Sequence, residues 1–254
     1  MRILITNDDG IHAKGLEILK AIALGISPDV WTIAPETNQS GTAHSMTLHT
    51  PLRLRTIDER THAVTGTPTD CVIMAVRHIL KDQPPELILS GVNHGSNLAE
   101  DVTYSGTVAA AMEGALLGIH SIALSQMMGF EDGERRAIWD TSLAHAPQVI
   151  KKLLAQTWNP NVLMNVNFPD TAPENVTGIA VTSQGVRDQA LLNIDSRSDP
   201  WGTPYFWFGF ERRLSTLVPG TDLAAIAENK ISITPLSVDL TDRDAAEVLA
   251  ARLG

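Results

Sequence analysis

The sequence predicts an α/β fold with a mostly parallel sheet flanked by helices and a β-hairpin extension near the C-terminal end. In the first 126 residues, short apolar runs rich in branched residues alternate with segments of helical period. Near-continuous apolar runs are typical of parallel strands buried on both faces, and alternation with helices implies right-handed crossovers. A change of texture after about residue 175 predicts the extension.

The strands of the expected sheet are short apolar runs bounded by turn-forming residues. They are expected at residues 2–6, 30–35, 87–91, 121–125 and 162–168. The stretch 46–64 is rich in Thr, Leu and Val without a helical period, so we expect an inserted β excursion there.

The helices are predicted from apolar residues that recur at three- and four-residue spacing. This spacing predicts helices over 69–81, 105–118 and 135–156, and another helix is expected to begin near Ile11. The small residues of 105–118 would let that helix pack closely against a sheet.

Beyond about residue 175 the segments 178–185, 204–210 and 231–236 are strand-like, whereas 186–204 is polar and irregular. We expect a single domain over 1–254, with a core of about 1–180 and a β extension of about 181–235 for oligomerisation. A C-terminal helix is expected over 240–253. An aromatic patch in the extension is either core or, on a protruding hairpin, a subunit contact. Its members are Trp201, Tyr205, Phe206, Trp207, Phe208 and Phe210.

Composition excludes several classes of protein. The chain of 254 residues has 43% hydrophobic and 19% charged residues, which is typical of a globular protein. A net charge of −10 argues against a nucleic-acid scaffold, which needs a basic face. The single cysteine, Cys71, excludes a disulfide framework within the chain, and no stretch approaches the ~20 apolar residues of a membrane span. The first residues show no cationic leader followed by a signal-type apolar region, because Arg2 leads directly into a strand-like run, so the cytoplasm is the expected compartment.

Short oxygen-bearing side chains follow three of the expected parallel strands. Asn7, Asp8 and Asp9 follow the first strand, Ser40 lies in the loop after the second, and Asn93 follows the third. Ligands of open parallel sheets bind outside the carboxyl ends of the strands. Oxygen ligands suit a hard cation such as Mg²⁺, Mn²⁺ or Ca²⁺ rather than zinc.

The alternative is that Asp8 only caps the helix expected near Ile11 and that Asn93 only makes a turn. One cap needs one carboxylate, so two adjacent ionised aspartates are better explained by a cation beside them. Ser105, Gly106 and Thr107 begin a helix whose amide groups and dipole would favour an anion, although Ser105 could also be a plain N-cap. Together these features predict a phosphate-ester site. "TGTPTDC" (65–71) is a second helix start that is explained mostly by capping, with lining of the substrate pocket as the alternative.

Several rival motifs are missing from the sequence. It contains no G-x-G-x-x-G, so a dinucleotide-binding oxidoreductase is disfavoured. Leu16 stands where a P-loop needs lysine, and "GVNHG" carries Asn93 where a nucleophilic serine would stand.

Five ordered motifs resemble the SurE survival-protein family of 5'/3'-nucleotidases. They are "ITNDDG", "APETNQSG", "GTPTDCV", "SGVNHGSN" and "YSGTVAAAMEG". The resemblance is strong to about residue 126 and looser through "DPWGTPYFWFG", "PGTDLAAI" and "ISITPL". It implies a Rossmann-like core and a phosphatase that hydrolyses nucleoside 5'- and 3'-monophosphates with one divalent cation per subunit, Mg²⁺ or Mn²⁺.

The resemblance also implies roles for residues at the matching positions. Asp8, Asp9, Ser40 and Asn93 would bind the metal. The resemblance does not identify the group that takes the proton of the attacking water; Asp8 or Asp9 is our first choice and His94 a weaker one. Asn97, Ser105, Gly106 and Thr107 would contact the phosphate. The C-terminal β extension would build a homodimer or homotetramer. The alternative function is a non-catalytic nucleotide or metal sensor that keeps the site.

Two departures from the family pattern stand out. Ala99 replaces the usual glycine in "NLAEDV", which leaves the ligands in place but could alter the loop's backbone. Ser237 replaces a frequent histidine after "ITPL". We expect these changes to affect assembly or specificity and not the reaction.

Overall fold

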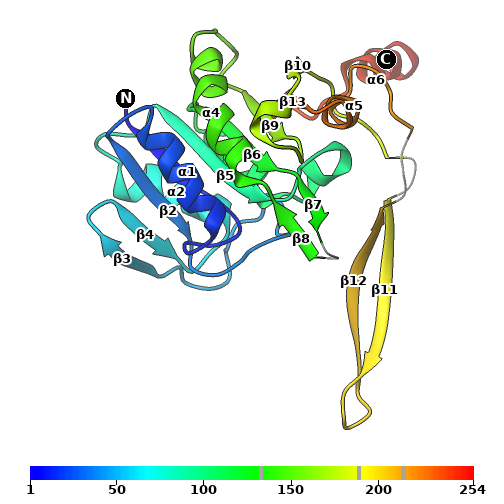
Figure 1. Ribbon diagram of the computed structural model, residues 1–254, viewed down its shortest axis with the longest axis horizontal. Helices are drawn as coiled ribbons and strands as arrows, with labels where there is room; N and C mark the ends of the chain where they lie inside the picture. The colour runs from blue at the N-terminus through cyan, green and yellow to red at the C-terminus, as the bar shows by residue number, and fades with distance from the viewer. Residues whose placement is uncertain (132–133, 188–189, 213–215) are drawn as a thin grey trace.

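The computed structural model describes residues 1–131, 134–187, 190–212 and 216–254 (Figure 1). A twisted nine-stranded sheet forms its centre. Its strands are β1 (Ile3–Thr6), β2 (Val30–Pro35), β3 (Leu54–Asp58), β4 (Thr61–Val64), β5 (Leu87–His94), β6 (His120–Gln126), β9 (Val162–Phe168), β10 (Gly178–Val181) and β13 (Lys230–Ser237). Their order is β10-β13-β9-β6-β5-β1-β2-β4-β3, and neighbours are parallel except at β13/β9 and β3/β4. The predicted α/β class is confirmed.

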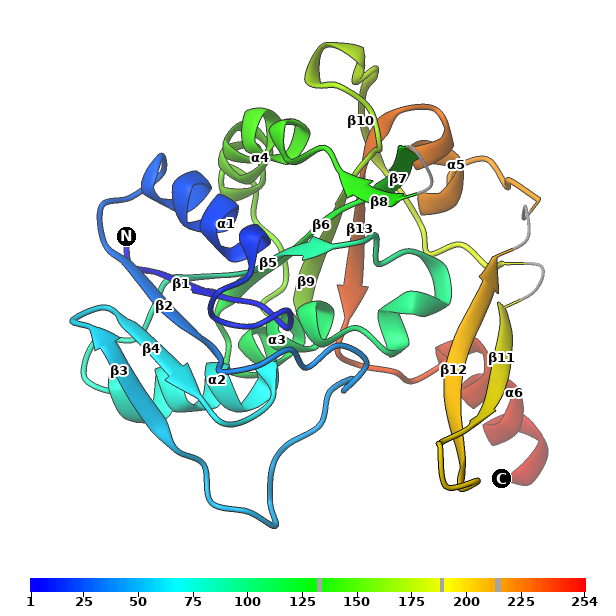
Figure 2. The ribbon, with the colours of Figure 1, turned by 60° about the horizontal axis from the view of Figure 1, so that its bottom comes forward.

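Helices cover both faces of the sheet (Figures 1 and 2). On one face, α1 (Lys14–Leu24) and α4 (Trp139–Leu154) bury Leu19, Ile22 and Ile150 against β1, β5 and β6. On the other face, α2 (Pro68–Met74) and α3 (Gly106–Leu116) pack against the alternate residues of the same strands. Two-sided burial explains the near-continuous apolar runs of β1 and β5.

The chain order creates a switch point between β1 and β5. From β1 the chain builds β2 and β4 on one side of the sheet, and then crosses to build β5, β6 and β9 on the other side. Because β1 and β5 are adjacent and parallel, with Thr6 opposite Ser90, the loops that leave them diverge above and below the sheet. Divergence of this kind opens a crevice at the carboxyl ends of the strands.

Three sequence expectations were wrong in detail. The helix expected over 135–156 begins at Trp139, because Glu134–Ala137 (β8) pairs with Met128–Glu131 (β7). The helix expected near Ile11 begins at Lys14, after a turn held by the Ala13 N–H on the Gly10 carbonyl. The helix over 69–81 is α2 followed by one π-helical turn, η1 (Ala75–Ile79).

The stretch expected as irregular, 186–204, contains a strand. β11 (Ala190–Ser198) and β12 (Pro204–Arg212) form an antiparallel ribbon that points away from the body of the protein (Figure 1). Neither strand joins the large sheet, so β11 needs no regular apolar face. Its polar sequence therefore lacks the alternating pattern from which a strand is predicted. The aromatic patch lies on this ribbon and its turn, with Trp207 62% and Phe208 72% exposed; the side chain of Phe210 lies outside the described residues. In the single chain, these rings are not core.

The segment 181–235 is therefore not one continuous extension. After the ribbon, α5 (Asp222–Ala227) packs against β13, and β13 returns to the large sheet between β9 and β10. The C-terminal helix α6 (Arg243–Leu253) forms where expected and buries none of its residues. In the part of the chain that the structure describes, no helix is both long and apolar enough to cross a membrane.

Candidate active site

The candidate site lies at the carboxyl ends of β1, β2 and β5. β1 leads into Asn7–Gly10, and β5 ends in Asn93 and His94. Gly10 turns the chain away at φ +103, and its carbonyl accepts a hydrogen bond of 2.9 Å from the Asn7 side-chain amide. A left-handed residue is needed at that turn, which explains the glycine after the two aspartates.

Asp8 is buried beneath the first turn of α3. Its Oδ1 accepts a hydrogen bond of 2.5 Å from the Thr107 hydroxyl, 99 residues away in sequence. Burial raises the pKa of Asp8 to about 6, the Thr107 bond lowers it, and the charge of Asp9 raises it again. In the protein alone, the ionised form of Asp8 is therefore destabilised, and a bound cation would relieve that cost.

Gly106 allows α3 to approach Asp8 this closely. A Cβ atom at Gly106 would lie 2.8 Å from Asp8 Cβ and 3.1 Å from Pro68 Cγ at the start of α2. Such separations are below normal contact, so only glycine fits between Asp8 and α2. Thr67 and Asp70 form a reciprocal capping box at the start of α2, which confirms that capping explains the 65–71 motif.

Asp9 and the end of β5 are joined directly. The His94 N–H donates to Asp9 Oδ2 at 3.2 Å, and the Asn93 side-chain amide donates to the Gly95 carbonyl at 2.9 Å. This second bond occupies the nitrogen of Asn93 and leaves its Oδ1 as the atom suited to a cation. Asp9 is half-buried, and so is Asn93.

The loop after β2 closes the other side of the site. The Gln39 N–H donates to the Asp8 carbonyl at 2.7 Å, and the Ala43 N–H donates to the Tyr104 carbonyl at 3.3 Å. Ser40, next to Gln39, is exposed, and its N–H bonds Asn38 Oδ1 at 2.8 Å. The loop thus connects the end of β1 with the segment that leads into α3.

Ser105 and Thr107, two of the expected phosphate contacts, have different hydrogen-bond partners. Ser105 accepts the Val108 N–H at 3.0 Å, so it is an N-cap, as the plainer alternative held. The Thr107 hydroxyl is bound to Asp8. The Thr107 O–H is therefore used by Asp8, whereas Ser105 only accepts and keeps its O–H as a donor. An anion at this helix end would meet the backbone N–H groups and the Ser105 O–H.

The Asn97 side chain points into a buried amide cluster. It donates to Ser125 Oγ at 2.8 Å, and its backbone carbonyl accepts from the side chains of Asn165 and Asn167 at 2.8 and 3.1 Å. Its N–H donates to Asn167 Oδ1 at 2.8 Å. The sequence expectation did not include this anchoring, because β9 lies about 70 residues further along the chain.

Ala99, which stands where the family usually has a glycine, adopts the left-handed conformation that a glycine would favour, with φ +51. Its N–H donates to the buried Asp222 carboxylate at 2.9 Å, and its carbonyl accepts from the Gln184 side chain at 2.9 Å. Arg187 holds the same loop through ion pairs to Glu100 and Asp101. The later part of the chain therefore holds this loop through Asp222, Gln184 and Arg187.

The donor set fits a hard divalent cation. Among the described residues, no Lys or Arg forms an ion pair with Asp8 or Asp9, and no group of three or more His, Cys, Asp and Glu is placed to hold a metal. The oxygens available are two carboxylates with no charged partner, a serine hydroxyl and an amide carbonyl. This set matches the preference of Mg²⁺ or Mn²⁺ and does not suit zinc.

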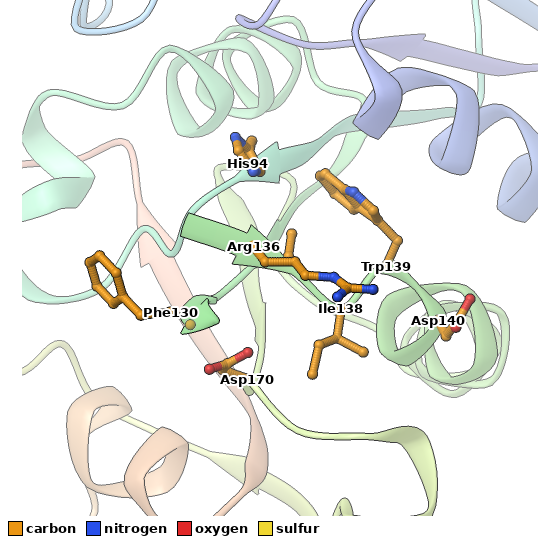
Figure 3. A pocket seen from close by; sticks show the side chains of 9 residues that line it. His94, Phe130, Arg136, Ile138, Trp139, Asp140 and Asp170 are labelled. Atoms are coloured by element: carbon orange, nitrogen blue, oxygen red, sulfur yellow. The ribbon is translucent and has the colours of Figure 1, made fainter. Parts of the chain in front are cut away.

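A cavity of about 810 Å³ adjoins the site (Figure 3). His94 lies on its wall together with Trp139 and Ile138 at the start of α4, the β7–β8 hairpin and Asp170 after β9. Sequence reasoning singled out neither Trp139 nor Asp170. No local signal marks them, because the hairpin and two chain segments far apart in sequence bring them together.

Known proteins resemble this chain over its whole length. Residues 3–190 match the family described as survival protein SurE. The chain is 57% identical over 254 residues to the 5'-nucleotidase SurE of Parvibaculum lavamentivorans, which covers 100% of this chain and 91% of the relative. It is 60% identical over 242 residues to the 5'-nucleotidase SurE of Methylorubrum extorquens, with 95% of each chain covered. The crystal structure of the SurE protein from Aquifex aeolicus has a TM-score of 0.84 at 37% identity, with both chains fully covered.

Proposed function

The chain belongs to the SurE survival-protein family, and on that premise we propose that it hydrolyses nucleoside 3'- as well as 5'-monophosphates with the help of a divalent cation. It is a hydrolase, a 5'-nucleotidase of that family. The observation that carries the proposal is the pair Asp8 and Thr107, because it joins a buried carboxylate to the N-terminus of α3.

The metal-binding residues of the proposal are Asp8, Asp9, Ser40 and Asn93, which would hold one Mg²⁺ or Mn²⁺ per subunit. When bound, the cation supplies a Lewis acid that polarises the phosphoryl group and makes a water molecule more acidic. The uncompensated charge of the two carboxylates and the raised pKa of Asp8 support this assignment.

The phosphate of the substrate would lie against the first turn of α3. The backbone N–H groups of Gly106 and Thr107, together with the helix dipole, favour the negative charge of the ester and the charge that develops in the transition state. Ser105 contributes by fixing this turn as its cap. Asn97 contributes by anchoring the loop between β5 and α3 through the buried amide cluster.

Asp9 is the better placed of the two aspartates to accept a proton from the attacking water. It is half-buried, whereas Asp8 is buried and already hydrogen-bonded to Thr107. His94 is a weaker choice, because its backbone contacts Asp9 while its ring stacks on Trp139 at 5.6 Å between centroids.

Assembly into a homodimer or homotetramer through the β11–β12 ribbon belongs to the same proposal. Aromatic side chains exposed on a ribbon outside the large sheet support it, since an exposed aromatic patch of this kind is typical of a subunit contact. The cytoplasm remains the expected compartment, and the only cysteine, Cys71, is buried and unpaired.

A phosphate-release assay tests this function. Metal-free protein is incubated with 5'-AMP, 5'-GMP and 3'-AMP, with Mn²⁺ or Mg²⁺ and with or without excess chelator. We expect metal-dependent release from both ester classes. Nucleotide binding without any release of phosphate would instead identify a sensor, and release that a chelator leaves unchanged would contradict the metal assignment.

A further inference from the structure

We propose that the cavity beside the metal-binding residues is the nucleobase subsite and that it favours guanine. This inference rests on the proposed nucleotidase function and adds the part of the substrate that the phosphate site does not address. The cavity encloses about 810 Å³, which is in the range of ligand pockets. Its wall combines aromatic rings with charged groups (Figure 3).

The cavity is connected to the metal-binding residues through His94. The His94 N–H is bonded to Asp9, and its side chain lies on the cavity wall. Asn93, a proposed ligand of the cation, is the preceding residue. A nucleotide whose phosphate lies between the metal-binding residues and the first turn of α3 would reach this cavity with its base by passing Asp9 and His94.

The aromatic rings of the cavity suit a flat heterocycle. The His94 and Trp139 rings stack with centroids 5.6 Å apart and an interplanar angle of 26°. A Cβ atom at Gly15 of α1 would lie 3.2 Å from the Trp139 ring, so α1 supports that ring from behind. Phe130 of β7 stands across the cavity with 73% of its surface exposed (Figure 3). The two rings occupy each other's inner faces, so a base would stack on the outside of this ring pair or on Phe130.

Asp170 supplies the polar edge. Its carboxylate packs so closely on the Gly129 backbone that a Cβ atom there would lie 1.9 Å from Oδ2, and the Gly129 N–H bonds this carboxylate. The carboxylate faces the cavity from the side opposite Trp139 (Figure 3). An ionised carboxylate only accepts hydrogen bonds, and it can accept two side by side. Guanine presents two adjacent donors, N1–H and the 2-amino group, whereas hypoxanthine lacks the 2-amino group.

A second cavity of about 540 Å³ also reaches the site at Ser105, but it suits a base less well. Its lining mixes small polar side chains with aliphatic ones such as Met112 and Leu236. The one ring that lines it, His44, is already bonded to Glu113 at 3.0 Å. The aromatic cavity is therefore the better receptor for the base.

The experiment compares variants of the full chain on GMP, IMP and ribose 5-phosphate with Mn²⁺. For Trp139→Leu we expect the ratio of kcat/KM for GMP to that for ribose 5-phosphate to fall roughly tenfold, mainly through KM, and Trp139→Phe should restore most of it. For Asp170→Asn we expect the GMP-to-IMP ratio to fall by a factor on the order of ten. Trp31→Leu, which removes a half-buried tryptophan outside the cavity, is the matched control for both ratios.

Binding of guanosine, measured calorimetrically, separates this inference from the nucleotidase function. Guanosine binding that Trp139→Leu and Asp170→Asn both weaken supports the subsite even if no phosphate is released. Metal-dependent hydrolysis with substrate ratios that neither variant changes would overturn the subsite and leave the nucleotidase function standing. Equal changes in the Trp31→Leu control would also overturn it.

Discussion

The carboxyl edge of the sheet and the β11–β12 ribbon depart from the usual burial rule in opposite ways. At the sheet edge a carboxylate, Asp8, is buried with no cationic partner among the described residues. On the ribbon, Phe206 and Trp207 are each 62% exposed. Charged groups are buried at a cost unless paired, and large apolar patches are rarely left exposed. Each region is therefore incomplete in a single chain.

The difference between the two regions lies in what would complete them. In our proposal, a small cation completes the carboxylates, because it fits between oxygens that different strands bring to one edge. The proposed partner of the ribbon is an apolar surface of similar size, such as the same ribbon of a second chain. The kind of departure from the burial rule thus indicates the class of ligand: a buried unpaired carboxylate favours a cation, and an exposed aromatic surface favours a protein partner.

The largest expected effect is the loss of catalysis when a site carboxylate is neutralised. Asp8→Asn and Asp9→Asn should each lower kcat for phosphate release by ~10²–10³ or more, because each removes a charge that holds the cation. The matched control is Asp195→Asn on the ribbon, where the carboxylate is exposed and pairs with Arg197. Full activity in both site variants, with folded protein by circular dichroism, would contradict a role for these carboxylates in binding the cation.

The next effect concerns the ribbon. Phe206→Ser combined with Phe208→Ser removes two rings from the same face of β12 and should leave a monomer at micromolar concentration where the wild type forms the proposed homo-oligomer. Sedimentation velocity measures the mass, and Leu24→Ser, an exposed leucine at the end of α1, is the control. An unchanged mass for the double variant would show that the assembly does not use the ribbon.

A third effect is that Asp8 makes the metal-free protein less stable as pH rises, which is the opposite of what an aspartate with a lowered pKa does. The pKa of Asp8 is raised from 3.8 to about 6, so its stabilising contribution is complete below about pH 4 and is lost as pH rises through 6. At pH 7.5 in the presence of chelator, the free energy of unfolding of Asp8→Asn should exceed that of the wild type by as much as about 3 kcal/mol. At pH 4 the two should agree.

Chemical denaturation with chelator at the two pH values measures this difference. Adding Mn²⁺ should then stabilise the wild type at pH 7.5 and leave Asp8→Asn almost unchanged. A variant that is less stable than the wild type at pH 7.5 in chelator would contradict the origin assigned to the raised pKa of Asp8.

The smallest effect comes from adding one methyl group. Gly106→Ala places a Cβ atom against Asp8 and should destabilise the protein by about 1–3 kcal/mol while lowering activity. Gly209→Ala on β12 is the matched control, because its nearest neighbour would be 3.9 Å away. Thermal unfolding and phosphate release together report both effects, and equal behaviour of the two variants would contradict the close approach of α3 to Asp8.

The sequence was sufficient where local pattern and topology agree. Strands β1, β2 and β5 are buried on both faces, so their apolar runs are plain, and the polar residues after them follow the rule for parallel sheets. Asp8, Asp9 and Asn93 were predicted in this way, and their role in binding a metal stays a prediction. The capping of α2 and α3 was also readable, since Thr67 and Ser105 stand at the helix starts.

What the sequence could not predict depends on contacts between distant segments. The inward turn of Asn97 requires Asn165 and Asn167 of β9, and the cavity with Trp139 and Asp170 requires a short hairpin that replaced the expected start of α4. The strand β11 was missed because a ribbon outside the large sheet buries no regular face. None of these features has a local period or motif.

We propose above that the carboxyl edge of the sheet holds one divalent cation through Asp8, Asp9, Ser40 and Asn93. Equilibrium dialysis of metal-free protein against Mn²⁺, with bound metal measured by electron paramagnetic resonance, tests it most directly. We expect a single Mn²⁺ per chain in the wild type and in Asp195→Asn, and none in Asp9→Asn at the same free concentration. Equal binding by Asp9→Asn and the wild type would contradict the claim.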